Sequence, residues 1–200
     1  MNAKIFEQAK LYALRRLERE LSPHLHYHRV EHTRDEVVPA AERLASMEGL
    51  KREARYLLLT AAWFHDLGYV EKLIYHELIS MRIAAQVLPG FGYTAKEVEV
   101  VRWAILATIL PQAPTTLLER VLTDADLDTL GRESFMVRNN DLRREFAYFG
   151  KKYSDIEWYR NQIKFLEDHK YFTPSARKLR GGGKLANIAE IKRKVKELEK

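Results

Sequence analysis

Apolar residues recur at helical spacing along almost the whole chain. Between residues 3 and 21 they form one stripe, made of Ile5, Ala9, Tyr12, Ala13, Leu17 and Leu21. Further helical patterns cover residues 30–47, 51–66, 76–88, 95–107, 115–123, 139–150, 154–168 and 185–198. The third of these nine patterns is apolar almost all round between Leu57 and Phe64, which is typical of the buried central helix of a bundle. No segment alternates as a strand would, so the pattern predicts an all-α helical bundle.

Three consecutive glycines, Gly181-Gly182-Gly183, come before the last helical pattern. Such a run favours a flexible hinge. The sequence therefore predicts a helical domain over residues 1–180, followed by the hinge and an amphipathic basic helix over residues 181–200. The apolar stripe of that helix consists of Leu185, Ile188, Ile191, Val195 and Leu198. It needs a cover, which either the same bundle or a second subunit of a homodimer can provide.

Composition narrows the possible classes of protein. The chain has 200 residues and no cysteine, which excludes a disulfide scaffold, a thiolate metal site and a cysteine nucleophile, and suits the cytoplasm. No apolar stretch approaches the roughly 20 residues that span a bilayer, so no membrane partner is expected. The net charge of +6 is concentrated at residues 170–200, where ten basic and three acidic residues lie. The rest of the chain is almost neutral, which argues against nucleic acid as a partner.

Three polar groups interrupt or end the helical patterns. His65-Asp66 ends the helical pattern that is apolar almost all round, His28 and His32 lie one helical turn apart upstream, and the segment 124–128 contains three aspartates downstream. Imidazole nitrogens and carboxylate oxygens from three helices can converge on one divalent cation. Because thiolates are absent, the ion would be Mn, Fe, Mg, Ni, Co or Zn.

The order His, His-Asp, Asp in the phrases YHRVEHT, AAWFHDLGY and TDADLDTLG resembles the HD superfamily of metal-dependent phosphohydrolases. The later phrase YFTPSARKLRGGGK is similar to the C-terminal continuation of small bacterial members. The resemblance covers roughly residues 24–131 and implies an all-helical bundle around a metal site. It implies the ligands His32, His65, Asp66 and Asp126, with Asp124 as the competing register.

What the resemblance implies for activity is hydrolysis of a phosphomonoester or phosphodiester bond, with a nucleotide as the expected small phosphate-containing substrate. Asp66 would serve the reaction as well as the metal. His76 would contact the substrate phosphate or donate a proton, although a helix-capping role stays open. Two-metal members of the superfamily hold their second ion with further histidines after the His-Asp doublet. Because no histidine lies between residues 76 and 169, the resemblance favours one metal over two.

Two basic residues are candidate phosphate ligands, because Lys72 and Arg132 each lie six residues beyond an expected metal aspartate. Solvated surface charge is the competing interpretation of both. The aromatic residues near the C-terminal third can stack on a base or pack in a core; they are Tyr148, Phe149, Tyr153, Trp158, Tyr159 and Phe165. The alternative function is a nucleotide-binding sensor that has the same fold and no turnover.

Overall fold

The computed structural model describes residues 2–200, and within that range it contains helices and no strand, which confirms the all-α fold class. The elements, in chain order, are α1 (Ala3–Glu20), η1 (His32–Val37), α2 (Val38–Met47), α3 (Arg52–Phe64), η2 (Leu67–Val70), α4 (His76–Phe91), α5 (Ala95–Leu106), α6 (Leu117–Asp126), η3 (Asp128–Gly131), α7 (Phe135–Tyr148), α8 (Asp155–Asp168) and α9 (Pro174–Leu198). Of the short elements, η1 is a π-helical turn, and η2 and η3 are 3₁₀ turns.

Local sequence explains where several helices begin and end. Thr94, Thr116 and Ser154 each start a helix with a capping box, in which a glutamate three residues later bonds back to the cap. The helical pattern predicted over residues 76–88 continues through Pro89, because α4 extends to Phe91. That helix ends at Gly92, whose φ of 99° is the left-handed conformation that glycine adopts at low cost.

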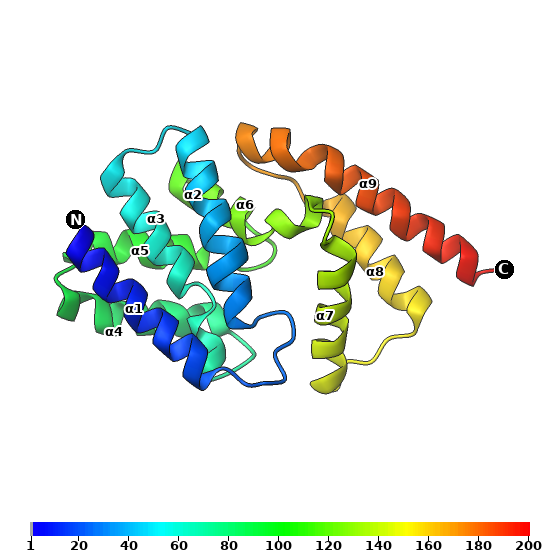
Figure 1. Cartoon of the computed structure of the whole chain (residues 1–200), viewed down its shortest axis with the longest axis horizontal. Helices are drawn as coiled ribbons and strands as arrows, with labels where there is room; N and C mark the ends of the chain where they lie inside the picture. The colour runs from blue at the N-terminus through cyan, green and yellow to red at the C-terminus, as the bar shows by residue number, and fades with distance from the viewer. Residues whose placement is uncertain (1) are drawn as a thin grey trace.

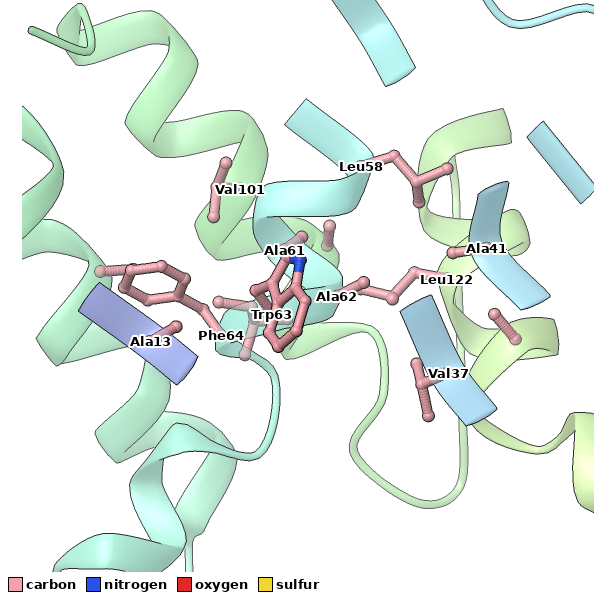
Figure 2. Packing of buried hydrophobic residues seen from close by; sticks show 14 of the residues in the cluster. Ala13, Val37, Ala41, Leu58, Ala61, Ala62, Trp63, Phe64, Val101 and Leu122 are labelled. Atoms are coloured by element: carbon pink, nitrogen blue, oxygen red, sulfur yellow. The ribbon is translucent and has the colours of Figure 1, made fainter. Parts of the chain in front are cut away.

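Helix α3 lies at the centre of the larger core, as its apolar pattern predicts. Leu58, Ala61, Ala62 and Phe64 are fully buried there, and side chains of α1, α2, α5 and α6 surround them (Figure 2). The His65-Asp66 pair directly follows this helix. The two candidate ligands thus lie at the end of a helix that the larger core surrounds.

Helices α7, α8 and α9 form a second group beside the α1–α6 bundle (Figure 1). Their smaller core contains Leu130, Phe135, Leu166, Ile188 and Ile191. Helix α9 therefore packs on its own chain, against α8 and η3. Its buried stripe is narrower than predicted, because Leu185 is 67% exposed and Leu198 is 43% exposed.

The predicted glycine hinge is wrong. Helix α9 runs without interruption from Pro174 to Leu198, so residues 181–183 are helical. A Cβ on Gly183 would lie 2.1 Å from the carbonyl oxygen of Gly131, and one on Gly131 would lie 2.3 Å from the carbonyl oxygen of Arg180. Glycine stands at both positions because two backbones cross there, and a side chain would not fit between them.

Among the helices of residues 2–200, none has the length and apolar character needed to cross a bilayer.

Candidate metal centre

Three buried side chains from two segments bring ligand atoms together at one point. His32 lies at the start of η1, and His65 and Asp66 follow α3; one ligand atom from each lies within 4.8 Å of the other two. His32 Nε2, His65 Nε2 and Asp66 Oδ2 are buried and have no hydrogen-bond partner. Since buried polar atoms are normally satisfied, three such atoms facing one another fit a cation site.

Hydrogen bonds on the far side of each imidazole fix which nitrogen faces the cluster. His65 Nδ1 donates to the carbonyl oxygen of Ala62 at 2.8 Å, and His32 Nδ1 donates to Glu36 Oε2 at 3.0 Å. Both Nε2 atoms are then available as ligands. Glu36 lies one turn beyond His32 in η1, and π-helical turns of this kind are frequent at functional sites.

Of the two candidate aspartates, Asp126 is the one whose carboxylate lies beside the cluster. Asp126 Oδ1 lies 3.5 Å from His32 Nε2 and 3.5 Å from His65 Nε2. Asp124 instead accepts hydrogen bonds from the backbone of Phe172 and Thr173 and from the Thr173 hydroxyl, at 2.7–2.8 Å. The structure thus brings Asp126 to the cluster, while Asp124 holds the segment that leads into α9.

Opposite charges outweigh burial in this cluster. Burial alone would lower the pKa of His32, but the carboxylates of Asp126 and Glu36 raise it above its usual value. Burial would likewise raise the pKa of Asp66, but His65 holds it well below its usual range. Asp66 therefore stays anionic, and its negative charge suits a divalent cation.

His76 also lies at the cluster. Its Nε2 is 3.3 Å from Asp66 Oδ1, and its ring stacks on Tyr69 with 3.8 Å between centroids. The position depends on Gly68, because a Cβ there would lie 1.9 Å from the carbonyl oxygen of His76. Tyr75, just before His76, takes the left-handed conformation with a φ of 63°, which is uncommon for a residue with a side chain. The chain thus turns sharply to bring His76 beside Asp66.

A cavity of about 480 Å³ opens from this cluster toward α7 and α8. Asp66, His76 and Asp126 line one end of it. The remaining wall is mostly apolar and aromatic, with a few polar side chains; it includes Tyr27, His28, Tyr69, Leu127, Leu130, Phe135, Arg138, Asn139, Phe146, Tyr153, Gln162 and Phe165. A pocket of this size and character is typical of a small-molecule site.

The predicted phosphate ligands do not line the cavity. Lys72 is exposed, in the connection between η2 and α4. Arg132 donates to Asp128 Oδ2 at 2.5 Å and to the carbonyl oxygen of Glu36 at 3.3 Å. Asp128 also accepts from Arg43 and from Arg180, so Arg132 belongs to a cluster that ties α9 to η3. Spacing from an aspartate therefore placed neither residue correctly, because Lys72 lies at the surface and Arg132 is held by Asp128.

The other basic residues of the C-terminal segment also lie outside the cavity lining. Arg177 donates to the carbonyl oxygens of Tyr171 and Phe172, and Lys184 donates to those of Leu166 and His169. They secure α9 to the chain. These two basic residues thus serve the packing of α9 rather than the cavity.

Sequence reasoning missed a second set of polar residues behind the site. Arg138 is buried, lies 3.0 Å from Glu36 Oε1, and donates to the carbonyl oxygen of Tyr27 at 2.8 Å. Glu145 accepts from the backbone of Tyr27 and His28, and from His28 Nδ1 at 2.5 Å. Only Glu36 had a signal in the sequence, since it lies four residues after His32. Arg138 and Glu145 meet partners more than 100 positions away.

No protein-family model matches the chain, and neither the curated proteins nor the solved structures give a match.

Proposed function

We propose that this protein is a metal-dependent phosphohydrolase of the HD type. It hydrolyses a phosphomonoester or phosphodiester bond in a small substrate, with a nucleotide as the expected class. The observation that carries the proposal is the convergence of three unpartnered buried ligand atoms, from His32, His65 and Asp66, beside a cavity of about 480 Å³ that Asp66 lines. Asp126 is the fourth ligand in this proposal, since its Oδ1 lies 3.5 Å from both imidazoles. A divalent cation held there would polarise a phosphoryl oxygen and acidify a water molecule.

The side chains around the cluster can manage the protons of such a hydrolysis. A water oxygen bonds to phosphorus, the bond to the leaving oxygen breaks, one proton leaves the water, and one reaches the leaving group. Asp66 Oδ1 and His76 Nε2, 3.3 Å apart, form a pair that can accept the proton of the water. His28 lines the cavity with its Nδ1 against the Glu145 carboxylate. In the imidazolium form, which this carboxylate stabilises, His28 would carry an Nε2–H that can protonate the leaving oxygen.

Metal analysis of the purified protein, followed by phosphatase and phosphodiesterase assays with Mn, Mg, Ni and Co, tests the proposal. We expect about one divalent ion per chain. His65→Ala and Asp126→Asn should lose both the ion and turnover. His24→Ala is the matched control, because this imidazole stacks on Tyr148 and does not line the cavity. Stoichiometric metal without turnover on any phosphate ester would favour the nucleotide-binding sensor, and absence of metal uptake would refute both functions.

A further inference from the structure

The wall of the cavity formed by α7 and α8 carries polar side chains that the proposed hydrolysis does not use. Asn139 and Gln162 line the cavity, together with the aromatic rings of Phe146, Tyr153 and Phe165. Inorganic phosphate alone would leave much of a volume of about 480 Å³ unfilled. The rest is available to the organic part of a substrate, and the aromatic rings offer apolar surface to a planar group.

A chain of hydrogen bonds fixes the orientation of the two amides. Trp158 is 1% exposed, and its indole Nε1 donates to Asn139 Oδ1 at 2.6 Å. Because an indole N–H can only donate, the atom it meets must be the amide oxygen of Asn139. The Asn139 nitrogen then donates to Gln162 Oε1 at 2.7 Å.

This chain has a consequence for Gln162. Its amide oxygen is committed to Asn139, so its Nε2 remains as a donor with no hydrogen-bond partner among residues 2–200. A rotation of the Gln162 amide by 180° would place its N–H groups against those of Asn139. Asn139 cannot rotate in turn to relieve this contact, because its oxygen has to accept the hydrogen bond from the buried Trp158. The cavity wall therefore carries a hydrogen-bond donor of fixed polarity.

We infer that Gln162 is a specificity-determining residue that reads a carbonyl oxygen on the edge of a planar ring in the substrate. In nucleotide terms, the site would favour bases with an oxo group over the corresponding bases with an amino group. The inference rests on the proposed function for the phosphate-bearing part of the ligand. The polarity of Gln162 follows from the hydrogen-bond chain alone.

Binding of nucleosides to the full-length protein, measured by calorimetry with and without Mn, tests the inference apart from hydrolysis. Inosine and adenosine are one oxo and amino pair, and uridine and cytidine are another. We expect the oxo member of at least one pair to bind about three- to tenfold more tightly, which is the range for one hydrogen bond. Binding of both members of each pair within twofold, or no binding of any of the four, would overturn the inference.

Variants identify the residue responsible. Gln162→Leu should abolish the preference, and Gln162→Glu should reverse it, because a carboxylate still accepts from Asn139 but has no N–H for the ligand. Trp158→Phe should bring the ratio of the oxo and amino affinities close to one, since Asn139 can then rotate. Lys164→Ala is the control on α8, because Lys164 pairs with Asp168 and does not line the cavity. If Trp158→Phe does not fold, the two variants of the partly exposed Gln162 decide the matter.

The outcome separates this inference from the proposed function. Nucleosides have no phosphate, so their binding does not depend on hydrolysis. An oxo preference in a protein without phosphohydrolase activity would leave the role of Gln162 intact and refute the proposed reaction. Turnover combined with a preference that survives Gln162→Leu would support the reaction and refute the role of Gln162.

Discussion

Replacing each glycine of the 181–183 run by alanine, one at a time, tests how α9 crosses η3. A Cβ on Gly181 or Gly182 would meet nothing within 4 Å, whereas one on Gly183 would lie 2.1 Å from the carbonyl oxygen of Gly131. Cβ atoms essentially never approach another heavy atom within 3.0 Å, so the two backbones would have to separate by about 0.9 Å. Both partners are main chain, and no flexible side chain can move aside.

The cost of the clash in unfolding free energy follows from comparing the three variants with one another. In a helix interior, alanine is about 0.8–1.0 kcal/mol more favourable than glycine. Gly181→Ala and Gly182→Ala should therefore stabilise the protein by roughly that amount. Gly183→Ala gains the same helix propensity, so its difference from Gly182→Ala isolates the cost of the clash. Overpacking of this kind costs about 1–3 kcal/mol.

Urea and thermal unfolding measure the difference. For a chain of this size, 1 kcal/mol corresponds to about 2–4 °C in Tm, so Gly183→Ala should melt about 2–12 °C below Gly182→Ala. Metal affinity should weaken in the same variant, because Asn187 of α9 donates to the carbonyl oxygens of Leu130 and Arg132, close to Asp126. If all three variants were equally stabilised, α9 would not pack on η3 as described. If none of the three changed the free energy of unfolding, the run would act as a hinge in solution.

Three further predictions concern single residues. His169 has two buried, unpartnered ring nitrogens, and burial together with Lys184 lowers its pKa to about 4. The unfolded state takes up a proton near pH 6.5 and the folded state does not, so stability should fall by about 2 kcal/mol between pH 7.5 and 5. Urea titrations of His169→Phe should lack this loss, and an unchanged pH slope would contradict the reasoning. Asp124→Asn should cost about 1–3 kcal/mol in unfolding experiments and leave metal binding intact, whereas Asp126→Asn should lose the metal at little cost in stability. The reverse pattern would exchange their roles. Gly68→Ala should displace the backbone of His76 and reduce turnover at least tenfold in steady-state assays, while retained turnover would show that the position of His76 does not matter.

The helices, and the chemistry at their ends, could be predicted because both leave local traces in the sequence. Apolar spacing predicted the nine α-helices of residues 2–200 to within a few residues at most boundaries, and the pattern that is apolar almost all round corresponds to the central helix α3. The largest error was at the start of α9, which begins at Pro174 rather than residue 185. It arose because glycine permits both flexibility and close packing. Close packing is required here by the backbone of Gly131, which lies more than 50 residues away in the sequence and crosses α9 at Gly183.

The candidate ligands could be predicted, whereas the opposite wall of the cavity could not. His65 and Asp66 are conspicuous because they directly follow a buried apolar helix, where an unpaired polar group would be costly. The pairing of His28 with Glu145, and the hydrogen-bond chain from Trp158 through Asn139 to Gln162, exist only once folding has brought α7 and α8 against the site. The two parts of the site thus rest on different elements, since the ligands belong to the bundle of α1–α6 and much of the opposite wall belongs to α7 and α8. Substitutions on α7 and α8 that keep Glu145 and Arg138 should therefore change which molecule binds and leave metal binding intact.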